Sequence, residues 1–466
     1  MADVFNFKPT KVVWDDRHCK LFTDFLSRME NVGVRYVILK NAEGLPYENN
    51  SKDIDILIEP GKYKIAADLL KSAYKEHGVA YYRVHKFERL RCWYGFNPHT
   101  EFAIHIDLLE GFLHKGFEVF PFDLFYEHSY KNSNGIFVLD ELYDNIILLL
   151  HSTICYHRIK NKYAKRIASA YTKNKDEIVF VLERVLGKSA TEKMCKDLDA
   201  ENYDAIAQNG RYYSHASKMR IFVRRPFFSI YNICDFLWEK VARLVLNLGR
   251  YNVFMSVHAP DGTGKTTFIQ EFCQTLGYYY ISAPEDLTKV YHYRPCLLPN
   301  LGAAGEKAGV MKQDKDFTNP HRAKPVGTLS SLIRMTYYVS DYVLGIPMIL
   351  RRNAQFDTIT IFDRYVYDLV VDPARTRISL PEWVRLLFTK IVKKPKLSFV
   401  LNTDADTIIK RKQELTLLEI ERQLAEFQSM ANRWNSRFVV LDASKKPEEI
   451  ANDAMITFCE KFCNKL

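Results

Sequence analysis

Residues 253–272 read Val-Phe-Met-Ser-Val-His-Ala-Pro-Asp-Gly-Thr-Gly-Lys-Thr-Thr-Phe-Ile-Gln-Glu-Phe. The apolar run Val253–Val257 predicts a buried strand, and the spacing of Phe268, Ile269 and Phe272 predicts a helix. A glycine-rich loop therefore connects a strand to a helix. In this context the backbone N–H groups of the loop and of the helix N-terminus converge on one point, where they can bind phosphate oxygens. The stretch predicts a phosphate-binding loop within an α/β domain.

The loop carries the groups that ATP and Mg²⁺ need. Lys265 would reach the β- and γ-phosphates, and the hydroxyl of Thr266 would hold Mg²⁺. Ala259 stands where the general pattern has its first glycine, and Pro260 has no N–H to donate. We therefore expect the donors in the later part of the loop. The predicted nucleotide-binding residues are Asp261, Gly262, Thr263, Gly264, Lys265, Thr266 and Thr267.

A second apolar run predicts a buried strand over Asp357–Phe362, followed by Asp-Arg-Tyr at 363–365. A carboxylate at the C-terminal end of a strand beside the first one is placed to hold Mg²⁺, its water or a substrate group. We therefore expect Asp363 to be a metal ligand. Further strands are expected at Leu397–Asn402 and Phe438–Leu441, and a last helix at Pro447–Phe462.

The sequence Asp-Gly-x-Gly-Lys-Thr-Thr at 261–267, followed later by Asp-Arg-Tyr at 363–365, resembles the thymidylate kinase family. The resemblance covers roughly Val253–Phe462. It implies a P-loop kinase fold, with a five-stranded parallel sheet and helices on both faces. It also implies transfer of the γ-phosphoryl group of ATP, with Mg²⁺, and a homodimer as in many members of the family.

The resemblance further assigns a basic lid to Lys410-Arg411-Lys412, after the third of these strands. Cations there would neutralise charge on the transferring phosphoryl group. The alternative is a solvated basic helix face. The catalytic residues that the resemblance implies are Lys265, Asp363, Arg364, Arg411 and Lys412.

The acceptor segment departs from the family pattern. Thymidylate kinases carry Arg-Glu-Pro there, whereas this chain has Arg294-Pro295 within His292–Pro299 and lacks the glutamate. The form Arg-Pro-x-Leu-Leu-Pro resembles a divergent branch of thymidylate kinase-like proteins that is often met in bacterial surface-polysaccharide gene sets. Arginines are suited to grip an acceptor anion, and a structural salt bridge is the alternative for each. The candidate acceptor residues are Arg294, Arg334, Tyr365 and Arg375, with Arg364 beside them.

The N-terminal part reads as a small α/β unit, with strands expected at Val34–Leu39, Asp53–Ile58 and Phe102–Leu108 and helices at Cys19–Glu30 and Tyr63–Glu76. Asp53 and Asp55 are two apart on a strand, so their carboxylates share a face. Asp107 and His105 share a face of the last strand in the same way. Three carboxylates on adjacent strands predict a two-Mg²⁺ site for phosphoryl or nucleotidyl transfer.

This spacing resembles the nucleotidyltransferase superfamily, in which a glycine-containing turn precedes the Asp-x-Asp strand. The turn here is Leu39-Lys40-Asn41-Ala42, so the close backbone approach that glycine allows is lost. The sequence therefore allows two interpretations. The Asp-x-Asp pair belongs to a second, nucleotidyltransferase activity, or it is a non-catalytic pair on a solvated strand.

The chain has 466 residues, which is long enough for several cores. We expect a nucleotidyltransferase-like α/β domain at 1–135, a helical subdomain at 136–215, a connector at 216–250 and the kinase-like domain at 251–466. The connector has a basic cluster at Met219–Arg225 that leads into an amphipathic helix at Phe227–Leu248. That helix would pack between domains or make a peripheral membrane contact.

Composition narrows the class of protein. Apolar residues make up 47% and charged residues 26%, as in folded soluble proteins, and no apolar run reaches the ~18 residues of a membrane span. The N-terminus lacks a secretory signal, which predicts a cytoplasmic protein. Nine cysteines without a CxxC pair suggest reduced, structural thiols. The net charge of +10 suits phosphate-rich ligands, and no signature of specific nucleic-acid binding is found.

The leading hypothesis is therefore an ATP-dependent kinase that phosphorylates a nucleotide or a sugar or glycan acceptor. Its partners would be ATP and a phosphate- or hydroxyl-bearing acceptor. Two alternatives are a genuine dTMP kinase with an accessory domain, and an ATP-gated binding protein without turnover.

Overall fold

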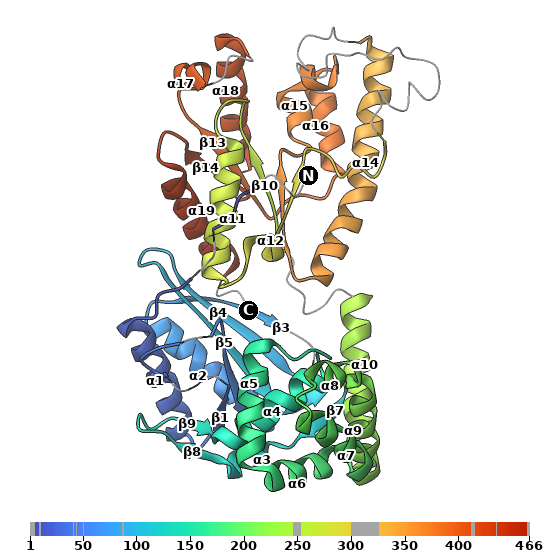
Figure 1. Ribbon diagram of the computed structural model, residues 1–466. Helices are drawn as coiled ribbons and strands as arrows, with labels where there is room; N and C mark the ends of the chain where they lie inside the picture. Colours follow the sequence, from blue (N-terminus) through green and yellow to red (C-terminus); the bar gives the residue numbers. More distant parts are fainter. Residues whose placement is uncertain are drawn as a thin grey trace. The chain divides into compact units, whose positions relative to one another are not determined.

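The computed structural model describes residues 5–8, 11–40, 42, 44–49, 51–85, 88–245, 253–299, 326–411, 415–434 and 436–463. The chain divides into two compact units (Figure 1). The C-terminal unit comprises Met1–Lys11, Pro98–Phe102 and Arg250–Leu466, and the N-terminal unit comprises Val12–Asn97 and Ala103–Gly249.

The C-terminal unit is built on a five-stranded sheet in which all strands are parallel, in the order β11-β12-β10-β13-β14. Its elements are β10 (Phe254–His258), α11 (Lys265–Tyr279), α12 (Pro284–Leu287), β11 (Thr288–His292), α14 (Thr328–Gln355), β12 (Ile359–Asp363), α15 (Asp368–Val371), the 3₁₀ helix η2 (Pro373–Thr376), α16 (Glu382–Lys390), β13 (Leu397–Asn402), α17 (Ala405–Arg411), α18 (Leu417–Arg433), β14 (Phe438–Asp442) and α19 (Pro447–Phe462). The expected α/β class with a five-stranded parallel sheet is confirmed.

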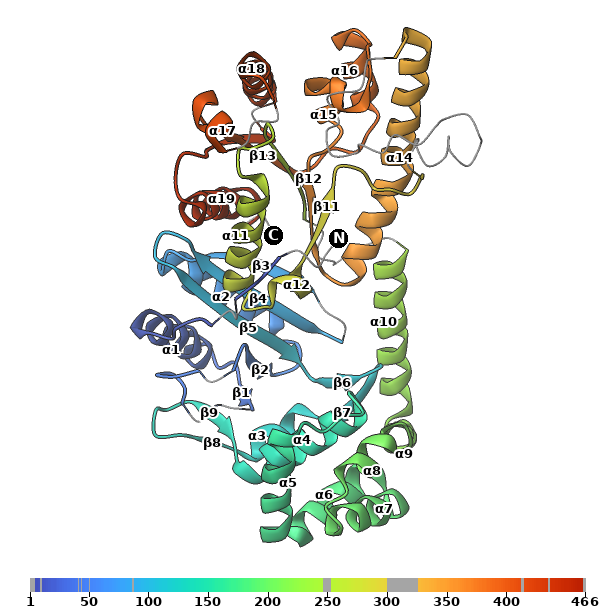
Figure 2. The same cartoon turned by 45° about the horizontal axis from the view of Figure 1, so that its top comes forward.

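Helices cover both faces of this sheet (Figure 2). On one face α11 packs against α19, and the rings of Phe268 and Phe272 both meet Phe399 of β13. On the other face, residues of α14 and α18 join one buried cluster with Phe254 and Phe362. Because both faces are covered, the central strands are mostly apolar, and this made them recognisable in the sequence.

Two details of the sheet differ from expectation. The edge strand β11 was not expected, because its sequence Thr-Lys-Val-Tyr-His forms neither an apolar run nor a regular alternation of polar and apolar residues. The strand expected to start at Asp357 begins at Ile359. Asp357 has φ +54°, and Thr358 donates its N–H to Asn353 O, so these residues form the turn after α14.

The N-terminal unit contains a seven-stranded mixed sheet in the order β3-β4-β5-β2-β1-β9-β8. Its elements up to the last strand are α1 (Asp16–Asn31), β1 (Tyr36–Leu39), β2 (Ile54–Ile58), α2 (Tyr63–Glu76), β3 (Ala80–His85), β4 (Leu90–Asn97), β5 (Phe102–Glu110), β6 (Phe112–His114), β7 (Phe117–Phe120), α3 (Phe122–Glu127), β8 (Ser129–Lys131) and β9 (Phe137–Leu139). Asp53 was expected on a strand but lies in the bend just before β2. The hydroxyl of Ser51 donates to its carboxylate within this bend.

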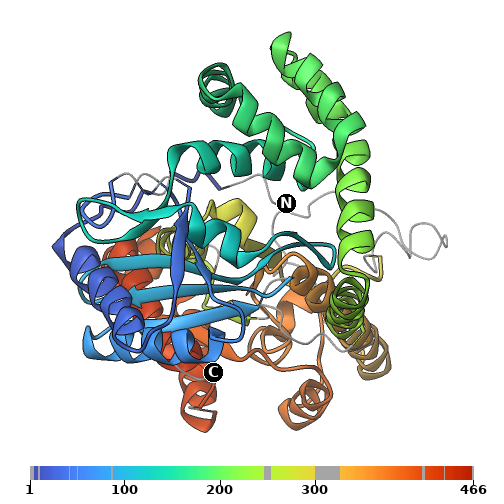
Figure 3. The ribbon, with the colours of Figure 1, turned by 90° about the horizontal axis from the view of Figure 1, so that it is seen from below.

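Seven helices complete this unit in the described part of the chain: α4 (Glu141–Ile154), α5 (Asn161–Lys173), α6 (Lys175–Leu186), α7 (Lys188–Asp199), α8 (Tyr203–Gln208), α9 (Gly210–Arg224) and α10 (Pro226–Leu244). They lie together to one side of the blue strands in Figure 3. The basic cluster at Met219–Arg225 leads into the helix α10, as expected, and most of the cluster itself forms the last turns of α9. Pro226 starts α10, as proline is favoured at the first position of a helix. The last expected residues of the connector helix, 246–248, lie outside the described residues.

None of the helices in the described ranges combines the length and the apolar character that a bilayer crossing requires.

Candidate functional site

The glycine-rich loop, residues 259–264, joins β10 to α11 in the C-terminal unit. Gly262 has φ +89° and Gly264 has φ +98°, values at which a side chain would be strained. The Thr263 hydroxyl donates to Pro260 O at 2.9 Å and closes the loop on itself. The loop therefore leads directly into the N-terminus of α11, whose first residue is Lys265.

The side chain of Lys265 folds back into this loop. Its Nζ donates to the carbonyl oxygens of Ala259 and Pro260, both at 2.9 Å, and lies 3.7 Å from Asp261 Oδ1. Burial and the neighbouring Arg364 guanidinium lower the pKa of Lys265 to about 8, although Asp261 acts in the opposite direction. The chain thus holds a buried ammonium group on neutral carbonyl acceptors at the start of a helix.

Asp261 is gripped by two arginines that come from another part of the chain. Arg364 and Arg375 each donate through NH2 to a different carboxylate oxygen of Asp261. Burial alone would raise the pKa of Asp261, but the charges of Arg364, Lys265 and Arg375 outweigh it and keep the pKa well below its usual range. The loop carboxylate is therefore ionised and fixed.

Asp363 ends β12, next to the strand that feeds the loop. It stands opposite His292 in the register of β11 and β12, and His292 Nδ1 lies 2.9 Å from Asp363 Oδ2. Burial would raise the pKa of Asp363, but the hydrogen bond with His292 and the charge of Lys265 hold it below its ordinary value. The other oxygen, Oδ1, is buried and has no hydrogen-bond partner among the described residues. One oxygen of an ionised carboxylate is thus left for a ligand.

A second carboxylate, Asp368, lies close to the guanidinium nitrogen of Arg364 that does not contact Asp261. It is fully buried, accepts from Tyr365 N–H at 3.2 Å and has Arg364 NH1 3.5 Å from its Oδ1. His258 lies 3.7 Å from its Oδ2. Sequence reasoning gave neither Asp368 nor His258 a role. The signal that the sequence offered for His258 was its position at the end of an apolar strand, immediately before the loop.

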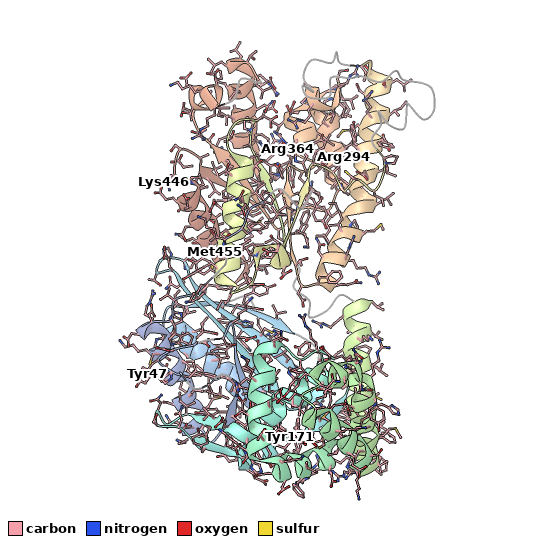
Figure 4. The ribbon with its side chains drawn as sticks, viewed as in Figure 1. Tyr47, Tyr171, Arg294, Arg364, Lys446 and Met455 are labelled. Carbon is pink, nitrogen blue, oxygen red and sulfur yellow. The ribbon has the colours of Figure 1, made fainter. Side chains whose placement is uncertain are left out.

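Arg294 lies near Arg364 at one end of the sheet (Figure 4) but makes a separate contact. Its NH1 donates to Asp341 Oδ2 of α14 at 3.2 Å, and its guanidinium lies 5.0 Å from the centre of the Tyr338 ring. Both partners of the ion pair are buried. Arg334 is half-buried on α14 and does not take part in this pair.

The remaining predicted residues lie at different places in the C-terminal unit. Tyr365 is buried in the core and donates its hydroxyl to Lys393 O at 2.7 Å, so its contact with an acceptor stays a prediction. Thr266 and Thr267 are exposed on the first turn of α11. Arg411 ends α17 and donates to Thr263 O at 3.4 Å, which brings it to the loop. Lys412 lies outside the described residues.

The N-terminal unit gathers its three predicted carboxylates. Single oxygens of Asp53, Asp55 and Asp107 lie within 4.8 Å of one another. Asp55 and Asp107 are direct neighbours in the parallel pairing of β2 and β5. Asp53 reaches the same place from the bend before β2. Because Mg²⁺ prefers carboxylate oxygens, this donor set fits one or more such ions.

The side chains of Lys40 and His105 contact this carboxylate cluster. Lys40 Nζ lies 3.3 Å from Asp55 Oδ2, and His105 Nε2 lies 2.8 Å from Asp107 Oδ1. Burial and the two other carboxylates raise the pKa of Asp55, and Lys40 opposes this shift. Burial would lower the pKa of His105, but Asp107 raises it above the ordinary value. Cys92 also approaches His105 and Asp107, which the scattered cysteines in the sequence did not suggest.

No model of a known protein family matches this chain, and no curated protein matches it either.

Proposed function

We propose that the C-terminal unit is an ATP- and Mg²⁺-dependent kinase of the thymidylate kinase-like class. It would transfer the γ-phosphoryl group of ATP to a phosphate- or hydroxyl-bearing acceptor such as a nucleotide, a sugar or a glycan. The observation that carries the proposal is the buried Lys265 ammonium at the N-terminus of α11, beside an Asp363 oxygen without a hydrogen-bond partner in the described residues.

Lys265 and the loop would bind the nucleotide. An anionic phosphate is a stronger acceptor than the neutral carbonyls of Ala259 and Pro260, so Lys265 would turn from them to the β- and γ-phosphates. The N–H groups at the start of α11 would donate to the same phosphates. Binding would thus use an ammonium group that the fold already holds in place.

The donor set beside Lys265 fits Mg²⁺. Asp363 offers a carboxylate oxygen, and Thr266 offers an exposed hydroxyl on the first turn of α11. The ion, when bound, would neutralise charge on the phosphoryl oxygens. Arg411 reaches the loop from α17 and would add a further positive charge at the γ-phosphoryl group.

The arginines that hold Asp261 are candidates for binding an anionic acceptor. Arg364 and Arg375 both pair with this carboxylate, and Lys265 Nζ lies 3.7 Å from it. Arg364 also lies 3.5 Å from Asp368 and Arg375 lies 3.4 Å from Asp372, so carboxylates balance these cations in the free protein. A phosphorylated acceptor would bind here by taking an arginine from one of these carboxylates.

The test is ATP turnover by the purified full chain with Mg²⁺, offering dTMP, other nucleoside monophosphates and phosphorylated sugars one at a time. We expect one acceptor class to stimulate ADP release well above the rate with water alone. Stimulation by dTMP only would favour a dTMP kinase with an accessory domain. Tight ATP binding without turnover for any acceptor would contradict the kinase and favour an ATP-gated binding protein.

Nucleotide affinity should weaken as the pH rises above about 8. Lys265 in the free protein has its pKa lowered to about 8, whereas a bound phosphate requires the charged ammonium and would raise that pKa again. Above pH 8 a proton must be taken up on binding, so the dissociation constant should rise by up to about tenfold per pH unit. Fluorescent-nucleotide titrations from pH 7 to 9.5 measure this. A Lys265→Arg chain, which stays charged, should show no such rise, and the same slope in both chains would contradict the assignment.

A second candidate function concerns the N-terminal unit. The convergence of Asp53, Asp55 and Asp107 supports a cation-dependent, nucleotidyltransferase-like activity. Such an activity requires that these carboxylates hold a divalent cation. A full chain that binds no Mn²⁺ through them would exclude it.

A further inference from the structure

Lys40 lies inside the carboxylate cluster formed by Asp53, Asp55 and Asp107. We propose that its ammonium group takes the place of one metal ion, so that the cluster binds a single divalent cation instead of two. The inference rests on the cation site proposed for the N-terminal unit and does not depend on the kinase activity of the other unit.

The chain positions Lys40 through contacts on its backbone. Lys40 follows the last residue of β1 and has φ +56°, a conformation that non-glycine residues seldom adopt. Its N–H donates to Asp144 Oδ1 at 3.0 Å, and Arg166 NH2 donates to the other oxygen of Asp144 at 2.6 Å. Asp144 is itself buried in the first turn of α4. A buried, charged side chain thus fixes the backbone from which Lys40 reaches Asp55.

The ammonium group occupies space that a second ion would need. In two-metal sites the ions lie roughly 3.5–4 Å apart and share carboxylate ligands. Lys40 Nζ lies 3.3 Å from Asp55 Oδ2, and Asp55 neighbours Asp107 in the sheet. A second ion would have to share Asp55 with this positive charge in a half-buried site, where the repulsion is only partly screened.

The three carboxylates lie close enough together to share one ion. Single oxygens of Asp53, Asp55 and Asp107 lie within 4.8 Å of one another. One divalent cation could therefore draw on all three.

A site with two ions and a site with one ion and Lys40 differ in the chemistry that they can support. A pair of ions can stabilise both the attacking and the leaving oxygen of a phosphoryl or nucleotidyl transfer. A single ion together with Lys40 would supply the positive charge that binding of a triphosphate requires. Lys40 would then be the residue that sets the metal stoichiometry of this unit.

The experiment is a titration of the full chain with Mn²⁺ without nucleotide, in which electron paramagnetic resonance counts free ions. An Asp107→Asn variant serves as the reference. The ions that the wild type binds and this variant does not are counted as bound to the cluster. We expect one such ion in the wild type. In Lys40→Met the affinity should rise at least about tenfold, or a second ion should bind, because a positive charge near the ion has been removed.

Two further chains separate this effect from a general change of charge. Lys52→Ala removes an exposed positive charge beside Asp53 in the sequence, and its affinity should stay within about twofold of the wild type. Lys40→Arg keeps the charge and should bind one ion. Thermal unfolding of each chain checks that it folds.

The outcomes distinguish the inference from the site on which it rests. Two cluster ions in the wild type, or unchanged affinity and count in a folded Lys40→Met chain, would overturn the inference and leave the cation site standing. No cluster ion in any chain would overturn both. If Lys40→Met does not fold, the wild-type count alone decides between one ion and two.

Discussion

Replacing Lys265 with alanine should lower acceptor-stimulated ATP turnover about 100- to 1000-fold. The variant loses the ammonium group at the N-terminus of α11, and removal of one well-placed donor of this kind commonly costs two to three orders of magnitude. Lys265 also stands beside Asp363, so its charge helps to keep that carboxylate ionised. Steady-state ADP release with the stimulating acceptor measures the loss.

Lys265→Met is the matched control, because it keeps most of the side-chain length and removes the charge. Its turnover should fall as far as that of the alanine chain. The fold should survive in both, because the lowered pKa means that the folded protein binds the Lys265 proton less tightly than the unfolded chain does. Charged Lys265 therefore does not stabilise the fold. More than about a tenth of the wild-type turnover in either folded variant would contradict the role assigned to Lys265.

Replacing Asp341 with alanine should destabilise the C-terminal unit by about 3–5 kcal/mol, because the buried Arg294 guanidinium would lose the carboxylate with which it forms a buried ion pair. The same carboxylate accepts the N–H groups of Cys296 at 3.2 Å and Leu298 at 2.8 Å. Asp341 thus fixes the segment after β11 to α14. Chemical denaturation measures the free energy of unfolding, and hydrogen exchange of the backbone amides in β10–β14 assigns the loss to this unit.

Two other changes calibrate this loss. Asp341→Asn keeps the shape and one acceptor for the Leu298 N–H but removes the charge, so its loss should be smaller than that of the alanine variant. Thr336→Ala changes an exposed residue of the same helix and should cost less than about 0.5 kcal/mol. An Asp341→Ala chain that loses no more than Thr336→Ala would show that the ion pair does not stabilise this segment.

The elements around the glycine-rich loop were predictable because their signals are local. Buried parallel strands give apolar runs, and residues 397–402 and 447–462 have the bounds that the sequence predicts. The edge strand β11 and the bend at Asp53 were missed, because short, partly exposed segments have no period that separates them from turns. The pairing of Asp55 with Asp107 was expected from the strands that carry them.

The sequence by itself determined that a strand, a glycine-rich loop and a helix carrying Lys265 follow one another. This order depends only on neighbouring residues and on the backbone conformations that Gly262 and Gly264 allow. Only the tertiary structure decided which charges meet. Asp261 and Arg364 are 103 residues apart, and Lys40 and Asp144 are 104 apart. Such pairs form where the order of strands in a sheet and the helices on its faces bring them together. No spacing in the sequence encodes that order.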